Sequence, residues 1–159
     1  MPDPSSFLRK LFAALLNSGI DATELELDHL CYRVESMDRY EALRRELNTK
    51  STLLGESIIG GRPIATYRLR DPFLFHDRRI DVVELPAPKP GSPYPEGFEH
   101  AEFVVVEDLL AFTEKHPDLP WDLSGSAKPR NAEVRLHFDD LSVKFHRQPL
   151  AEVIEQEKA

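Results

Sequence analysis

The chain has 159 residues, of which 41% are apolar, and a formal net charge of -8. This length suits one domain with its own core, and the acidic balance argues against general binding to nucleic acid or to an anionic membrane. The chain has one cysteine, Cys31, so no intrachain disulfide can form, and its first residues lack the pattern of a signal peptide. We therefore expect a cytoplasmic protein that binds neither nucleic acid nor a membrane; its oligomeric state is left open.

The first half of the chain is predicted to begin with an extra helix. Apolar residues within 5–18 recur on one face at a period near 3.6, Ser5 or Ser6 can cap the helix, and Gly19 can end it. A strand at 27–34 follows, and then a helix that Ser36 can cap. Three further strands are expected at 52–59, 64–70 and 79–85, with turns at Gly60-Gly61 and Asp71-Pro72.

A proline-rich joint separates the two halves. Residues 86–97 contain five prolines and two glycines, so they can form neither a helix nor a central strand, and we interpret them as a linker. The elements expected after the joint are a strand at 98–105, a helix at 107–116, weaker segments around 121–127, a hairpin over 132–147 that turns at Asp139-Asp140, and a charged helix from Leu150.

The two halves match each other. Asp28-His29 corresponds to Glu99-His100, each pair stands near the start of a strand that leads into a helix, and each half closes with a strand followed by proline. Such a repeat usually means two paired copies of one supersecondary unit. We predict an α+β protein of 1–159 as a single domain, with βαβββ modules at 27–85 and 98–149.

Side-chain alternation along the strands predicts where the histidines point. Apolar residues alternate with polar ones in both first strands, and the apolar sets should pack under the helices. His29 and His100 then share the opposite, polar face, where neutral imidazole commonly binds a metal. The alternative is a pair of inert, hydrogen-bonded histidines. In the final hairpin, the turn predicts Arg135 opposite Lys144, and Glu133 opposite His146, on the same face.

The chain resembles the YecM family, which belongs to the vicinal oxygen chelate superfamily. The resemblance covers nearly the whole chain and rests on LDHLCYRVES, GGRPIATYRL, VVELPAPKPGSPYPEGFEHAEFVV and VKFHRQPLAEVIEQE. The proline-rich joint that runs directly into Glu-His is the most specific of these segments. The resemblance implies two paired βαβββ modules in a curved, cupped mixed sheet that holds a divalent metal ion on its concave side.

The resemblance also implies a ligand set. The matching positions are His29, Glu84 and His100, and the fourth ligand position falls on Lys144 or His146. We favour His146, because it lies at the same distance from the end of its strand as Glu84 does. Two or three histidines with one carboxylate suit zinc, iron, manganese, nickel or cobalt, and ligand type alone does not choose among them.

The remaining polar residues of this face suggest two functions. Glu102 can orient a ligand histidine or, like Glu133, move a proton. Asp28 and Glu99 are expected to be surface charges or bulge residues and not partners of the ligand histidines. The residues predicted to bind a small anionic substrate are Arg33, Arg68, Arg135 and Lys144. The first function is a metal-dependent isomerase, lyase or oxygenase, and the second is a non-catalytic small-molecule binding module. Whether the protein is an enzyme is left open.

Overall fold

The computed structural model describes residues 1–91 and 93–159, which form four helices and seven strands. The chain divides into two compact units, the first made of Met1–Asp3 and His29–Glu99, the second of Pro4–Asp28 and His100–Ala159. The division falls inside strands β1 (Glu26–Arg33) and β5 (Gly97–Val104). The predicted α+β class is confirmed; the single domain stays a prediction.

The first unit is a mixed sheet with one helix against it. Its strands follow the order β2-β3-β4-β1, where β2 is Ser51–Ile59, β3 is Arg62–Phe75 and β4 is Arg78–Pro86; β1 and β4 are parallel and the other pairs antiparallel. Helix α2 (Met37–Lys50) begins at Ser36, whose hydroxyl accepts from the backbone N–H of Arg39, as predicted. The α2 residues of the buried core are Tyr40, Leu43 and Leu47, which join Tyr67, Val83 and Leu85 of the strands.

Strand β3 is longer than the sequence predicts. The expected turn at Asp71-Pro72 is wrong, because β3 runs through it to Phe75 and the chain turns at His76, whose φ is 53°. The pairing of β3 with β4 shifts register between Arg68 and Phe73. Pro72 has no N–H to donate to a ladder, and this interruption of regular pairing gives it a place inside a strand.

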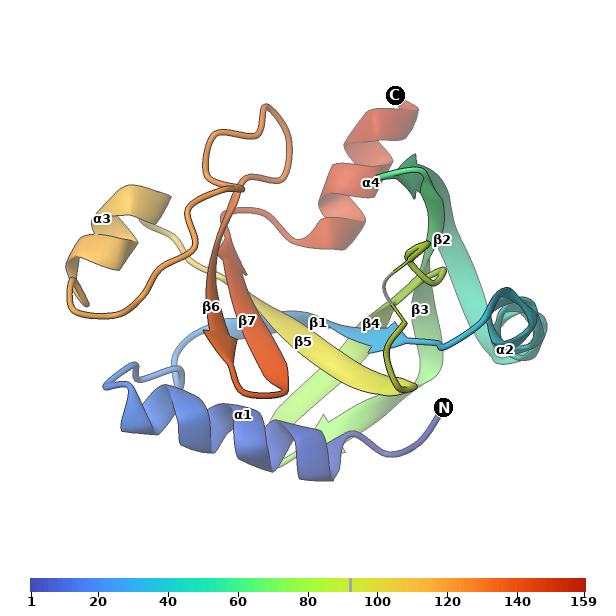
Figure 1. Cartoon of the computed structure of the whole chain (residues 1–159), viewed down its shortest axis with the longest axis horizontal. Coiled ribbons are helices and arrows are strands. Elements are labelled where there is room, and N and C mark those ends of the chain that lie inside the picture. The colour runs from blue at the N-terminus through green and yellow to red at the C-terminus, as the bar shows by residue number, and fades with distance from the viewer. Residues whose placement is uncertain (92) are drawn as a thin grey trace. The chain divides into compact units, whose positions relative to one another are not determined.

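The second unit packs two helices against its strands (Figure 1). Its strands follow the order β5-β7-β6, with β6 at Glu133–Phe138 and β7 at Leu141–His146. Phe12 of α1 (Ser5–Asn17) meets Phe103 edge-on at 5.8 Å, and Phe112 of α3 (Leu109–Glu114) lies 4.8 Å from Phe145, both measured between ring centroids. The helices therefore cover the apolar face that alternation predicted. The N-terminal helix belongs to this second unit.

Helix α1 ends as predicted at Gly19 but does not begin with the predicted serine cap. Gly19 has a φ of 79°, in the left-handed region that favours glycine, just where the helix ends. At the other end Pro4 precedes the first helical residue and no side chain caps the helix, so the prediction of a Ser5 or Ser6 cap is wrong. A proline tolerates this place because the first N–H groups of a helix have no partner within it.

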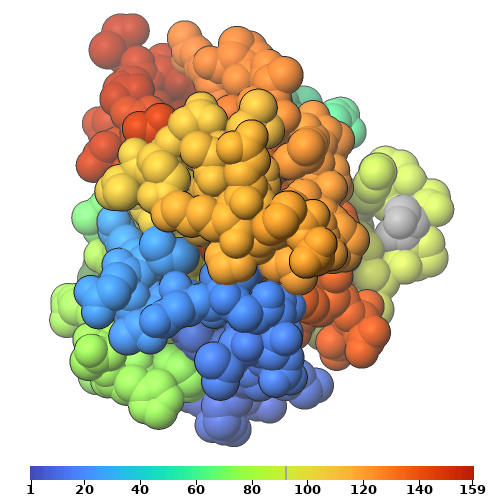
Figure 2. Space-filling view, turned by 90° about the vertical axis from the view of Figure 1, so that its left-hand side faces the viewer, coloured from blue at the N-terminus to red at the C-terminus, as the bar shows by residue number. Residues whose placement is uncertain are grey.

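The repeat is visible in the strand pairing of each unit. In both, the first strand is parallel to the last and the last is antiparallel to the one before it. The second copy is reduced, however: of the segment predicted at 121–127, the structure retains an isolated bridge between Asp122 and Arg135. Residues 124–131, SGSAKPRN, lack the alternating apolar residues of a strand, and with α3 they form a surface of the second unit (Figure 2).

The proline-rich joint is fastened to the first unit by hydrogen bonds. The Glu96 carboxylate accepts from the Tyr32 hydroxyl at 2.9 Å and from two nitrogens of Arg39 at 2.8 and 2.9 Å. Arg39 lowers the pKa of Glu96, and burial, with the hydrogen bond to Glu96, raises the pKa of Tyr32 to about 12. Arg62 adds a hydrogen bond to the Ala87 carbonyl at 2.9 Å. Ser92, within the joint, lies outside the described residues.

Over residues 1–91 and 93–159, no helix combines the length and the apolar character that crossing a membrane requires.

Candidate metal centre

Two candidate ligands stand side by side on β5. His100 and Glu102 are two residues apart in a strand, so their side chains share a face, and both are buried, with 5% and 2% of their surface exposed. The His100 Nε2 lies 3.2 Å from the Glu102 Oε1. This pair lies on the face opposite Phe103, as alternation predicted.

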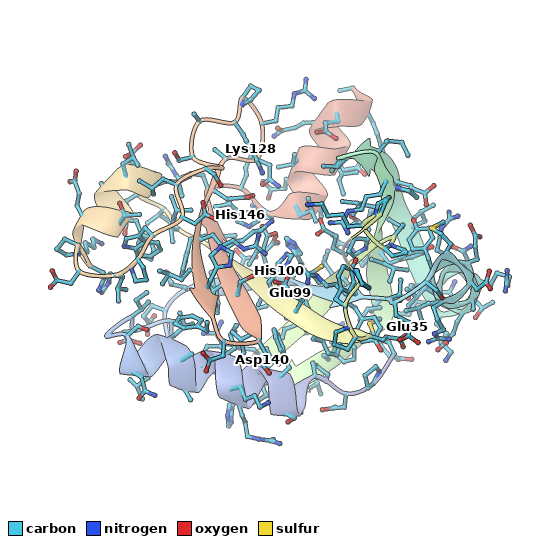
Figure 3. The ribbon with its side chains drawn as sticks, in the orientation of Figure 1. Glu35, Glu99, His100, Lys128, Asp140 and His146 are labelled. Atoms are coloured by element: carbon cyan, nitrogen blue, oxygen red, sulfur yellow. The ribbon has the colours of Figure 1, made fainter. Side chains whose placement is uncertain are left out.

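Glu102 also contacts the neighbouring strand β7. In the parallel register Glu102 pairs with Lys144 and Val104 pairs with His146. The Lys144 ammonium lies 3.6 Å from Glu102 Oε1, and His146 Nδ1 lies 3.1 Å from Glu102 Oε2. Figure 3 shows His100 and His146 on these two strands. Glu102 is thus the residue at which the polar side chains of the second unit meet.

The structure corrects the expectation that Asp28 is a surface charge. Asp28 is 8% exposed, accepts the backbone N–H of Leu150 at 2.9 Å, and has its Oδ2 3.1 Å from the Nε2 of His146. Leu150 opens helix α4 (Leu150–Lys158), so the carboxylate takes up an N–H that the helix itself leaves without a partner. No local signal predicts this, because 122 residues separate Asp28 from Leu150.

His146 is enclosed by acceptor oxygens. Its ring is fully buried, and its Nδ1 lies 3.2 Å from the side-chain oxygen of Asn131 in addition to the contact with Glu102. Asp28 Oδ2 faces the other ring nitrogen at 3.1 Å, so both nitrogens of the ring lie beside side-chain oxygens. His146 as the fourth metal ligand stays a prediction, and Glu102 is a further candidate ligand.

Glu133 holds the ammonium groups of two lysines. The register predicted for the hairpin is confirmed, with Glu133 opposite His146 and Arg135 opposite Lys144. Glu133 Oε1 lies 3.0 Å from the Lys128 ammonium and 3.6 Å from that of Lys144. Lys128 comes from the loop that precedes β6 (Figure 3). Glu133 is therefore neutralised in place, and its predicted role in proton transfer stays a prediction.

The loop that precedes β6 packs closely against Glu133, and a small substitution in this loop should lower stability. A Cβ at Gly125 would lie 2.8 Å from both Cγ and Oε1 of Glu133. We expect Gly125→Ala to lower the free energy of unfolding by about 1–3 kcal/mol, because overpacking moves a buried side chain away from its partners. Chemical denaturation measures the change. Ala127→Ser in the same loop, at an exposed position, is the control, and equal stability of the two variants would contradict the close fit.

In the first unit, His29 and Glu84 share the face opposite α2. Cys31 pairs with Glu84 between the parallel strands β1 and β4, and His29 has the same alternation as Cys31. Val83 and Leu85, on either side of Glu84, belong to the core beneath α2. His29 is fully buried. These placements agree with the prediction for this unit, and the role of both residues as ligands stays a prediction.

The predicted anion-binding residues already have partners. Arg33 lies 3.5 Å from the carboxylate of Glu99 and 4.5 Å from the centre of the Tyr94 ring. Arg68 lies 3.9 Å from Asp81 and is half exposed. A bound anion would have to compete for these guanidinium groups.

Arg135 is hydrogen-bonded to β7, where two of its nitrogens donate to the Ser142 hydroxyl at 3.0 and 2.8 Å.

A polar pocket of about 240 Å³ is lined in part by Asn131, whose side-chain oxygen lies 3.2 Å from the His146 ring. The pocket is lined by Pro129, Arg130, Asn131, Gln148, Val153, Gln156 and Glu157. It gives the second unit a solvent-accessible recess next to its buried charges.

The spacing of the His100–Glu102 pair in the second unit fits a divalent metal ion. Ligands about 2.1 Å from one ion stand roughly 3–4 Å apart, and the His100–Glu102 pair is separated by 3.2 Å. Candidate ligands of nitrogen and oxygen type are His100 and Glu102 in the second unit and His29 and Glu84 in the first. Such a set suits zinc, iron, manganese, nickel or cobalt.

The fold and these side chains define an α+β protein built from two related modules that carry candidate metal ligands on their polar faces. The model of the YecM protein family matches residues 1–157, and the chain belongs to this family. It is 27% identical over 172 residues to Protein YecM of Escherichia coli (strain K12), an alignment that covers 99% of this chain and 92% of that protein.

Solved structures agree with this assignment. The chain is similar to a structural-genomics structure called Protein EC4020, with a TM-score of 0.81, 27% identity, and coverage of 96% of this chain and 87% of that one. It is also similar to a putative dioxygenase from Bacillus subtilis, with a TM-score of 0.50, 11% identity, and coverage of 79% and 41%. The second likeness concerns the fold alone.

Proposed function

We propose that the protein binds a divalent metal ion and, with it, a small anionic molecule, in the manner of the vicinal oxygen chelate superfamily. The observation that carries the proposal is the buried pair of His100 and Glu102, whose donor atoms stand 3.2 Å apart on one strand. His29 and Glu84, in the first unit, are the further ligands that the sequence predicts. The fold likeness to a putative dioxygenase is compatible with this superfamily. We further propose a cytoplasmic location.

The chain's own residues would do the following around the ion. A bound divalent metal would supply a Lewis acid for a substrate with adjacent oxygens. Arg135 and Lys144, which are opposite each other in the β6–β7 register, would face the negative charge of such a substrate. Glu133 would hold or move a proton at its carboxylate, beside the ammonium groups of Lys128 and Lys144. An isomerase, a lyase or an oxygenase would each suit this arrangement.

A non-catalytic binding module is the second candidate. It is favoured by one observation: Glu133, a predicted proton-transfer residue, is engaged by Lys128 at 3.0 Å. A carboxylate in a charge-assisted hydrogen bond with an ammonium group suits a binding site and exchanges protons poorly with a substrate. Turnover of oxygen-rich small acids by the metal-loaded protein would separate the two functions.

The metal proposal is tested by metal content. We expect protein purified without a histidine tag to contain a stoichiometric transition metal, and His100→Ala or Glu102→Gln to lower metal affinity by about 10–100-fold or more. Inductively coupled plasma mass spectrometry and zinc titration calorimetry measure these quantities. His29→Ala and Glu84→Gln should show losses of the same order.

The matched control is His76→Asn, which removes an exposed histidine at a positive φ that asparagine also tolerates. This variant should bind metal like the wild type. Undiminished binding by His100→Ala would remove the proposal.

A further inference from the structure

We infer that Lys144 is a built-in competitor of the metal ion for Glu102, and that Glu133 is the place where its ammonium is held when the metal binds. The inference rests on the proposed function, because it takes Glu102 as a metal ligand. It concerns only residues of the second unit: Glu102 on β5, Glu133 on β6 and Lys144 on β7.

The first step is the position of the ammonium group. Lys144 Nζ lies 3.6 Å from Glu102 Oε1, which is also the oxygen that lies 3.2 Å from His100 Nε2. The metal ion and the Lys144 ammonium would therefore compete for the same atom, Glu102 Oε1. The Lys144 side chain is 15% exposed and that of Glu102 is 3% exposed, so solvent screens this competition little.

The second step is that Lys144 has an alternative carboxylate. Its Nζ lies 3.6 Å from Glu133 Oε1, the same distance as to Glu102. Glu133 stands on the opposite side of β7 from Glu102, because β7 lies between β5 and β6. When a divalent ion takes Glu102, repulsion between the two cations would drive the ammonium toward Glu133 with no need for a new partner.

The third step is the part played by Lys128. Its ammonium lies 3.0 Å from Glu133 Oε1, and its side chain is 50% exposed. Lys128 therefore neutralises Glu133 while Lys144 is drawn to Glu102, and being exposed it can swing into solvent when Lys144 arrives. Through this exchange, metal affinity depends on a residue, Glu133, that is not itself a ligand.

The three residues predict effects of opposite sign. Lys144→Met removes the competing charge and should tighten zinc and manganese binding by about tenfold or more, whereas Lys144→Arg keeps the charge and should stay close to the wild type. Glu133→Gln leaves Lys144 with Glu102 and should weaken binding by about tenfold. The double variant Glu133→Gln/Lys144→Met should bind like Lys144→Met, because without the ammonium Glu133 has nothing to hold.

Isothermal titration calorimetry of the metal-free full-length protein with zinc and with manganese measures these affinities, and thermal unfolding establishes that each variant folds. Adding Glu102→Gln to Lys144→Met should abolish the gain. A purely structural role of Lys144 predicts instead that Lys144→Met and Glu133→Gln weaken binding together. If Lys144→Met does not fold, unchanged or tighter binding by Glu133→Gln overturns the inference by itself.

The inference and the proposed function can fail separately. Wild-type protein that binds metal, with no tightening in Lys144→Met, overturns the inference alone. Wild-type protein that binds no metal, with Glu102-dependent binding in Lys144→Met, supports the inference and removes metal binding from the native function. Absence of binding in both proteins overturns both.

Discussion

Replacing Asp28 by alanine is expected to lower the free energy of unfolding by about 3–5 kcal/mol. The Asp28 carboxylate accepts from Leu150 at the start of α4 at 2.9 Å and lies 3.1 Å from the ring of His146, which is fully buried. Removal of one partner leaves a buried polar ring and a helix N–H without compensation, and this penalty exceeds the net contribution of the pair itself. Urea denaturation measures the loss.

Two local readouts show that the loss arises at this contact. The Leu150 amide should exchange its hydrogen faster in Asp28→Ala, as measured by NMR. The pKa of Glu26 is raised first by burial and then by the charge of Asp28, so it should fall in the variant. Asp28→Asn keeps an oxygen for Leu150 and should lose less stability than Asp28→Ala. Equal stability of Asp28→Ala and the wild type would contradict the buried contact.

Replacing Phe145 by alanine should also cost about 3–5 kcal/mol, because the cavity falls in the centre of the second unit's core. Phe145 is fully buried, and its ring centroid lies 4.8 Å from that of Phe112, 5.9 Å from Phe103 and 5.8 Å from Trp121. These three neighbouring rings limit how far the surrounding side chains can collapse into the cavity. Chemical denaturation measures the change.

Trp121 is the only tryptophan of the chain, so its fluorescence reports directly on this cavity. Its emission should shift in Phe145→Ala and stay constant in Val106→Ala, which truncates a side chain that is 85% exposed and should leave stability nearly unchanged. A Phe145→Ala variant as stable as Val106→Ala would mean that the apolar face of β7 is not the helix-covered one.

Alternation along the strands was sufficient to predict the faces of the sheet in each unit. The pattern places His100 and Glu102 opposite Phe103, and the hairpin turn places Glu133 opposite His146; the structure confirms both. These are local properties. The pleat makes side chains alternate every residue, and a short turn fixes the register of the two strands that it joins.

The same reasoning failed where the chain departs from regular geometry. Asp71-Pro72 predicts a turn, yet β3 continues past it because a shift in register accommodates the missing N–H of Pro72. The repeat predicts a strand-like segment at 121–127, yet this segment contributes a single bridge at Asp122. Both outcomes depend on the strand that pairs with the segment, and the sequence of the segment alone does not specify that partner.

The sequence by itself determined the family, the α+β class, the internal repeat and the polar face of each unit: that of His29 and Glu84 in the first and that of His100 in the second. Only the tertiary structure decided which charges meet within a unit. Asp28 became the partner of His146 and Leu150, and Glu102 became the carboxylate shared by His100 and Lys144. The physical reason is that a buried charge takes its partner from whatever segment packs against it, and such partners lie far apart along the chain.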